Sequence, residues 1–127
     1  MGIMAMARLP DDALVVYGGR NMPENFVKGS GVVIRSDGSM DGVSVNCAPD
    51  ATLDELTMPI AATDHPGIRN GQIGVTSVGK IRAAGGDVVA EPSETNAKHA
   101  TLIGLTPEKA SELFRPTLAN PAKRTKK

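Results

Sequence analysis

The sequence has little of the residue types on which several classes of protein depend. It contains one cysteine, no tryptophan, one tyrosine and two phenylalanines, and its acidic and basic residues balance at fourteen each. One thiol excludes an internal disulfide framework and any zinc or iron–sulfur site held by several cysteines. Three aromatic rings are too few for a platform on which the bases of a single strand stack. No apolar run reaches the roughly 20 residues that cross a bilayer, so we expect no membrane span.

The balanced charge hides an uneven distribution along the chain. Four of the fourteen basic residues lie in the last five positions, 123–127, which hold no acid. The rest of the chain carries ten basic and fourteen acidic residues, so it lacks the broad positive field of a non-specific nucleic-acid binder. We expect a basic, disordered tail at 122–127 and an N-terminal extension at 1–12, flanking one domain at 13–121.

The spacing of apolar residues predicts short strands and short helices that do not alternate strictly. Strand signals occur at 13–17, 31–35, 43–47, 73–76, 87–90 and 99–103. Helix signals, which are capping residues, early prolines or helical spacing, occur at 23–28, 52–59, 77–84 and 106–114. We therefore expect an α+β domain with two or three short helices and a curved, largely antiparallel sheet of four or five strands.

The clearest local pattern predicts a hairpin over 31–47. A β-branched segment is followed by the turn pair Asp37-Gly38 and then by a strand in which apolar and polar residues alternate. Ser44 and Asn46 lie on the polar face of that strand, where they either line a cleft or form the wet side of the sheet. Cys47 lies on the apolar face and is expected to be a buried, unreactive thiol.

His99 is the strongest candidate for chemistry. In a strand, His99, Thr101 and Ile103 share one face while the residues between them take the other. Imidazole titrates near neutrality and can accept or donate a proton, and the Thr101 hydroxyl and the neighbouring Lys98 can steady a charged intermediate. A histidine that merely hydrogen-bonds at the start of a strand is an equally good interpretation of the pattern.

Three cations are candidates for binding a phosphate. Arg20 follows a glycine pair that lets the backbone approach an anion, and Lys28 precedes a second glycine-containing turn. Both turns are also consistent with plain connections that carry solvated cations. Lys80, on the helix predicted at 77–84, either reaches the site or faces solvent.

The remaining signals for chemistry are weak. His65 lies among turn-forming residues at 63–71, where a solvated turn residue is the expected role. The acidic residues and histidines do not form a metal-ligand set with recognisable spacing, so we expect no metal and no cofactor. The nucleophile elbow of serine hydrolases is also missing.

Several stretches together resemble a known family. These stretches are VYGGRNMPENF at 16–26, GSGV at 29–32, GVSVN at 42–46, GQIGVTSVGKIR at 71–82, NAKHATL at 96–102 and GLTPE at 104–108. Together they are similar to the C-terminal toxin modules of bacterial polymorphic toxins, which end contact-dependent inhibition (CdiA-type) and Rhs-type effectors. The similarity covers roughly residues 13–121.

The resemblance implies a compact ribonuclease of the barnase, EndoU, colicin or RelE-like group. Such an enzyme cleaves tRNA or another structured RNA by attack of the 2′-hydroxyl, without a metal, and a cognate immunity protein neutralises it. It acts in the cytoplasm of the target bacterium, after delivery as part of a larger effector. By this resemblance His99 is the acid or base, Thr101 orients it or binds phosphate, and Arg20, Lys28 and Lys80 stabilise charge. Ser44, Asn46 and Lys98 then contact the substrate.

Two other functions remain open from the sequence. Arg20, the pair Thr76-Ser77 and either Glu91 or Glu94 occupy positions suggestive of mono-ADP-ribosyl transfer, although the glutamates lack the usual spacing. Alternatively, the chain is a non-catalytic binding or immunity-like module whose acidic surface pairs with a basic partner.

Overall fold

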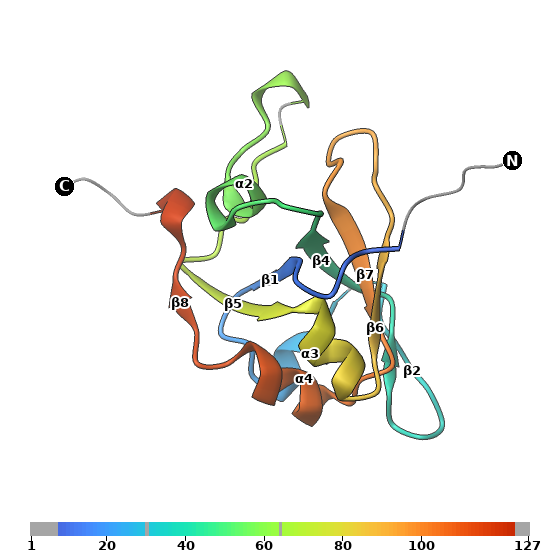
Figure 1. Ribbon diagram of the computed structural model, residues 1–127. Coiled ribbons are helices and arrows are strands. Elements are labelled where there is room, and N and C mark those ends of the chain that lie inside the picture. The colour runs from blue at the N-terminus through green and yellow to red at the C-terminus, as the bar shows by residue number, and fades with distance from the viewer. Residues whose placement is uncertain (1–7, 30, 64, 124–127) are drawn as a thin grey trace, which may run out of the picture.

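The computed structural model describes residues 8–29, 31–63 and 65–123. Its centre is a six-stranded sheet in the order β6-β7-β4-β1-β5-β8, in which every neighbouring pair is antiparallel (Figure 1). The strands are β1 (Leu14–Gly18), β4 (Val43–Cys47), β5 (Gln72–Ser77), β6 (Asp87–Ala90), β7 (His99–Ile103) and β8 (Leu118–Ala119). The α+β class predicted from the sequence is confirmed, with one more strand in this sheet than expected.

Four short α-helices lie in the described part of the chain, and their starts follow the capping signals of the sequence. They are α1 (Pro23–Val27), α2 (Leu53–Thr57), α3 (Val78–Ala83) and α4 (Pro107–Phe114). Thr52 Oγ1 accepts the Glu55 N–H at 3.1 Å, and the Glu55 carboxylate accepts the Thr52 N–H at 2.8 Å. This reciprocal capping box satisfies two backbone donors that the first turn leaves free. None of these helices is long and apolar enough to cross a membrane.

The two faces of the sheet are covered unequally. Helices α1, α3 and α4 pack on one face and form the larger core, which includes Phe26, Ile81 and Phe114. On the opposite face, Leu56 of α2 packs with Val16 and Ile73 in a small second cluster. Figure 1 shows α2 on one side of β1 and β5, with α3 and α4 on the other. The second face is left partly open over β4 and β7.

The three aromatic residues form one group within the larger core. The rings of Tyr17 and Phe26 stack with centroids 4.5 Å apart, and Phe26 lies 5.8 Å from Phe114. The Tyr17 hydroxyl donates to the Asn25 carbonyl at 3.1 Å, and burial raises the pKa of this phenol. The rings tie β1 to α1 and α4, each at the 4.5–7 Å spacing that favours aromatic pairs.

The hairpin predicted over 31–47 is wrong in its second strand. The turn at Asp37-Gly38 forms, but it joins β2 (Val33–Ile34) to β3 (Met40–Asp41), a two-stranded sheet of its own. Strand β4 pairs instead with β1 and β7 in the main sheet. Gly42, at φ +80°, separates β3 from β4 and redirects the chain. The alternation within β4 is confirmed, since Val43, Val45 and Cys47 are buried.

The ends of the domain differ in part from the sequence prediction. Leu9, which we placed in an N-terminal extension, is buried in the larger core, and Asp11 pairs with Arg82 at 2.6 Å. Within the tail predicted at 122–127, residues 122 and 123 belong to the short 3-10 helix η2 (Pro121–Lys123), and 124–127 lie outside the described residues. A second 3-10 helix, η1 (Ala61–Thr63), follows α2.

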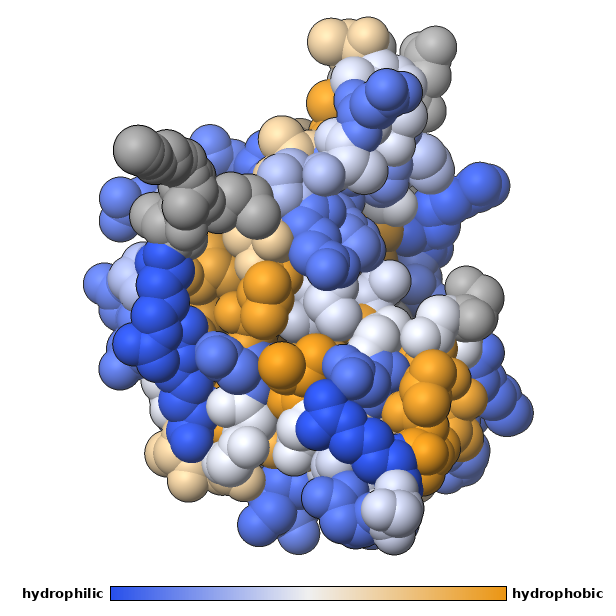
Figure 2. Space-filling model, turned by 90° about the vertical axis from the view of Figure 1, so that its right-hand side faces the viewer, coloured by the Kyte–Doolittle hydropathy of each residue, from blue (hydrophilic) through white to orange (hydrophobic). Residues whose placement is uncertain are grey.

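The side of the molecule formed by β6 and the β2–β3 hairpin has a mixed surface. Figure 2 shows separate apolar patches there, with charged and weakly polar groups between them. The exposed hydrophobic residues of these elements are Val33, Ile34 and Val89.

Candidate functional site

The open part of the sheet carries a row of polar side chains at strand spacing. Ser44 and Asn46 on β4 face the same way because successive strand residues alternate. On β7 the same holds for His99 and Thr101, while Ala100 points into the core. The register places Asn46 opposite His99 and Ser44 opposite Thr101. The sequence placed each pair on one face of its own strand, and the pairing of β4 with β7 brings the two pairs together.

A hollow of about 410 Å³ lies over this face. Its floor is formed by β1, β4 and β7, and its walls by residues 65–70 of the loop after α2 and by Asn96 of the loop between β6 and β7. Figure 1 shows both loops rising on the same side of the sheet. The polar residues of this first hollow that the argument uses are Ser44, Asn46, His65, Arg69, Asn96 and His99.

The imidazole of His99 is held at both nitrogens. Nδ1 lies 2.9 Å from the carbonyl oxygen of Glu91, and Nε2 lies 3.2 Å from the Oγ of Ser44. A carbonyl oxygen only accepts, so Nδ1 carries the proton of the neutral ring and Nε2 is the acceptor. The Ser44 hydroxyl therefore donates to Nε2. This tautomer presents a basic nitrogen at an exposed hydroxyl.

His65 lies on the same hollow, which corrects its assignment as a solvated turn residue. The side chain is half-buried, and its Nδ1 accepts the Gly67 N–H at 3.0 Å. Its backbone carbonyl accepts the Ile60 N–H at 2.8 Å, so the loop folds back on itself. The neighbouring Ile68 packs into the second cluster. Ile68 is an apolar residue within a run of turn formers, and this pattern was the sequence signal that the loop is anchored to the core.

Arg69 is the cation that the structure brings to the hollow, and sequence reasoning missed it. It is exposed at the rim. Gly18 favours the close approach of the Arg69 loop to β1, because a Cβ there would meet the side chains of Asn70 and Ile68. Asn120, 1% exposed, donates through Nδ2 to the carbonyls of Ile68 and Asn70, both at 2.8 Å. The loop is therefore fixed on both sides of Arg69.

The side chain of Asn46 joins α2 to the loop between β6 and β7 through two hydrogen bonds. Its Nδ2 donates to the Leu56 carbonyl at 2.7 Å, and its Oδ1 accepts from Asn96 Nδ2 at 2.9 Å. Above them, Thr63 Oγ1 donates to the Thr95 carbonyl at 2.8 Å and joins the two wall loops. Of the two roles left open for Asn46, the structure favours the lining of a hollow, but its amide is committed to these bonds.

A second hollow of about 470 Å³ adjoins the first, and Ser44 and His99 line both. The Thr101 hydroxyl lines it too and donates to the carboxylate of Glu91. Asp41 contributes a second carboxylate, which pairs with Arg35 at 2.7 Å. Thr101 thus lies in the second hollow only, on the same strand face as His99.

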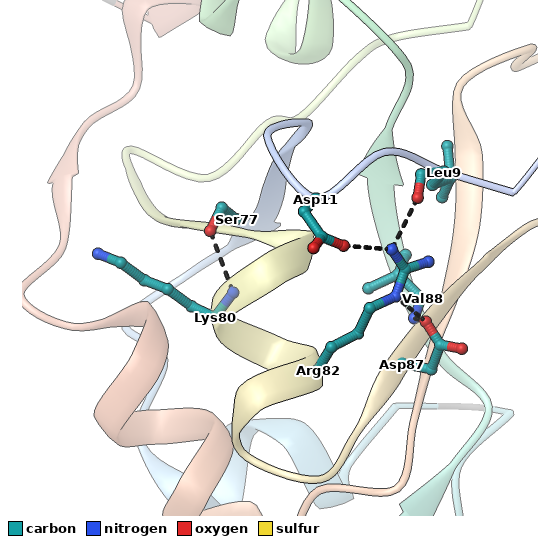
Figure 3. Close-up of polar contacts among 7 residues, drawn as sticks. All are labelled: Leu9, Asp11, Ser77, Lys80, Arg82, Asp87 and Val88. Carbon is teal, nitrogen blue, oxygen red and sulfur yellow. Dashed lines mark hydrogen bonds and ion pairs between the residues drawn. The ribbon is translucent and has the colours of Figure 1, made fainter.

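The structure does not bring the other predicted cations to either hollow. Arg20, Lys28 and Lys80 are exposed and line neither of them. Figure 3 shows Lys80 and Arg82 leaving α3 in opposite directions, and α3 packs on the far face of the sheet. Lys98 is half-buried and also lines neither hollow.

The residues considered for ADP-ribosyl transfer are dispersed. Thr76 is buried, and Ser77 accepts the Lys80 N–H at 3.2 Å as the cap of α3. Glu91 lines the second hollow, whereas Glu94 is exposed outside both. Within 8–29, 31–63 and 65–123, no group of three histidine, cysteine or acidic side chains is arranged to hold a metal ion.

Comparisons of the chain with protein-family models, with curated proteins and with solved structures found no match. The site must therefore be interpreted from its own geometry.

Proposed function

We propose that this domain is a ribonuclease that cleaves RNA by attack of a 2′-hydroxyl on the adjacent phosphodiester. One observation carries the proposal: both histidines of the sequence line the same hollow, although they come from different elements. Two imidazoles on one cavity provide a base and an acid for a reaction that moves two protons. Arg69 at the rim adds a guanidinium, the group best suited to a phosphate.

Each group then has one role. His99 Nε2, held as an acceptor by the Glu91 carbonyl, takes the proton of the 2′-hydroxyl. The 2′-oxygen bonds to phosphorus, and Arg69 stabilises the charge on the phosphoryl oxygens. His65, which takes up a proton at Nδ1 and so gives up its hydrogen bond from the Gly67 N–H, donates its Nε2 proton to the 5′-oxygen as the P–O5′ bond breaks. The products are a 2′,3′-cyclic phosphate and a 5′-hydroxyl, and water returns both histidines to their starting states.

The acidic body is compatible with this chemistry because the positive charge is local. Arg69 and the two imidazoles line one hollow, whereas a non-specific binder needs basic residues over a whole face. A recessed site between two loops suits a folded RNA such as a tRNA, whose loops present splayed nucleotides. The resemblance to polymorphic-toxin modules supports a role as a toxin in the cytoplasm of a target bacterium, with a cognate immunity protein as partner.

The test is incubation of the purified protein with total bacterial RNA in EDTA. Wild type should produce discrete fragments that end in 2′,3′-cyclic phosphate. His99→Ala should reduce cleavage by about 10²–10⁴-fold, the contribution of a positioned acid or base. Lys109→Ala, on the exposed side of α4, is the control and should cleave like wild type. Intact RNA at high protein concentration would contradict the proposal and favour a binding module.

A further inference from the structure

The position of the second hollow makes it part of any reaction at His99. Ser44 and His99 form its border with the first hollow, and Glu91, whose carbonyl holds the His99 ring, contributes its carboxylate to the lining. When a phosphodiester lies against His99 in the first hollow, one of the two substrate groups attached to it therefore lies next to the second hollow. In RNA, the groups that flank the phosphodiester are a sugar and its base.

The polar groups of the second hollow are acceptors. In the free protein the Thr101 hydroxyl hydrogen is directed to Glu91, and that of Ser44 is directed to His99. The charge of Asp41 is compensated by Arg35. Glu91 takes part in none of the ion pairs found among the described residues. A carboxylate has about four lone-pair sites, and Thr101 occupies one of those on Glu91.

The rest of the lining suits a flat ring. Gly31 and Gly42 present backbone without side chains, and Val33 offers an apolar side chain that is 62% exposed. Gly42 must be glycine, because it has φ +80° and a Cβ there would collide with the backbone of Gly31. The backbone conformation at Gly42 thus requires a wall without side chains there, and this wall leaves room for a planar group beside Glu91.

We propose that the second hollow binds the nucleobase next to the cleaved phosphodiester, and that Glu91 selects bases with an exocyclic amino group over uracil. The inference rests on the proposed ribonuclease function and names the substrate group that this part of the site takes. An amino group donates to the free carboxylate oxygen, whereas the O4 of uracil brings a lone pair against it. Acidic side chains that accept from the N4 amino group of cytosine use the same complementarity.

The test compares dinucleotides that differ in this amino group. CpA is compared with UpA, and ApC with ApU, so that the base on either side of the phosphodiester is examined. Wild type should cleave the cytidine member of one pair about tenfold faster in kcat/KM, the size of one good base contact. In Glu91→Gln the amide oxygen still accepts from Thr101, but the amide nitrogen now donates, so the ratio should fall to about one or reverse. Glu94→Gln, an exposed change in the same loop, should keep the wild-type ratio.

Failure of this inference differs from failure of the proposed function. Cleavage with equal rates for both members of each pair, or a ratio that Glu91→Gln leaves unchanged, overturns the role of Glu91. If no RNA or dinucleotide is cleaved, the ribonuclease proposal fails and the subsite is judged by binding alone. Calorimetric titration with cytidine and uridine 3′-monophosphates then decides it. A cytidine preference that Glu91→Gln abolishes supports the subsite, and equal affinities overturn it.

Discussion

Ser44 Oγ and His99 Nε2 lie 3.2 Å apart, although 55 residues separate them in the chain. Adjacent antiparallel strands bring them together, and the Glu91 carbonyl at the other nitrogen makes Nε2 the acceptor. In the proposed reaction, the hydroxyl of Ser44 occupies the place that a 2′-hydroxyl takes when RNA binds. The same pair would also serve a reaction in which Ser44 itself is the nucleophile. Substitution of Ser44 distinguishes these two mechanisms.

Ser44→Ala should retain cleavage within about tenfold of wild type, whereas His99→Ala should lose at least about a hundredfold. The physical reason is that the RNA supplies its own nucleophile, so removal of the serine hydroxyl takes away only a hydrogen bond. The measurement is kcat/KM on one RNA substrate for both variants, with circular dichroism to check the fold. An equal, severe loss in Ser44→Ala would indicate a serine nucleophile and contradict the proposed mechanism.

The two histidines should both be required for cleavage. In the proposed reaction His99 accepts the proton of the 2′-hydroxyl and His65 donates one to the 5′-oxygen. His65→Ala should therefore lower kcat/KM on an RNA substrate by about 10²–10⁴-fold, the contribution of a positioned acid. A wild-type kcat/KM in His65→Ala would exclude His65 as the acid.

Asn120→Ala should lower both stability and cleavage. The Asn120 side chain holds the carbonyls of Ile68 and Asn70, which lose these partners in the variant. Loss of partners for part-buried carbonyls costs about 1–3 kcal/mol, visible as a lower urea midpoint. Because Arg69 lies between the two anchored residues, cleavage should fall by more than the unfolded fraction explains. Thr117→Ala, which removes an exposed hydrogen bond to Gln72, is the control and should change neither.

The cluster around Arg82 should make stability depend on acid pH. Figure 3 shows Arg82 donating to Asp87 and Asp11 and to the Leu9 carbonyl. Burial alone would raise the pKa of Asp87, but the hydrogen bonds from Arg82 and from the Val88 N–H outweigh it and lower the pKa. A carboxyl with a lowered folded pKa contributes its full stability above the ordinary value of about 3.9 and loses it as pH falls below that value.

The measurement is the urea midpoint of wild type at pH 7 and pH 3, compared with that of Asp87→Asn. Asp87→Asn should have a lower urea midpoint than wild type at pH 7. Its midpoint should also fall less between pH 7 and pH 3, because the Asp87 carboxyl that takes up a proton is absent. Asp12→Asn, at an exposed aspartate that makes none of the ion pairs found in the described residues, should keep the wild-type acid dependence. If the urea midpoint falls equally between pH 7 and pH 3 in wild type and in Asp87→Asn, the Arg82–Asp87 pair is not the source of the acid dependence of stability.

Cys47 should be inert in the folded protein. Burial raises the pKa of this thiol to about 11, although the nearby Arg82 lowers it. The reactive thiolate is therefore scarce at pH 8, and the residue is only 2% exposed. Iodoacetamide should modify Cys47 in urea and leave it intact in buffer at pH 8, as followed by intact mass. Rapid modification in buffer would mean that β4 opens readily.

Local sequence patterns predicted most of the individual elements. Thr52, Ser77 and Thr106 each cap the helix that follows, because a side-chain oxygen satisfies a backbone donor within three residues. The alternation at 43–47 and 99–103 also predicted which residues face the core. The partner of β4 was mispredicted, since alternation determines a face and does not determine a neighbouring strand. The two-residue strand β8 carries too short a pattern to be recognised.

The candidate site divides in the same way. Ser44 and Asn46 were predicted on one face of their strand, and His99 and Thr101 on one face of theirs, because side chains alternate along a strand. The pairing of β4 with β7, which joins the two pairs, was not predicted. Only the tertiary structure decided which other residues lie near them. His65 and Arg69 line the same hollow as His99, and Glu91 lines the second hollow. Arg20, Lys28 and Lys80 lie elsewhere. Periodicity acts over a few residues, whereas these contacts depend on strand order and on how a loop is anchored by Asn120, which the pattern of neighbouring residues does not encode.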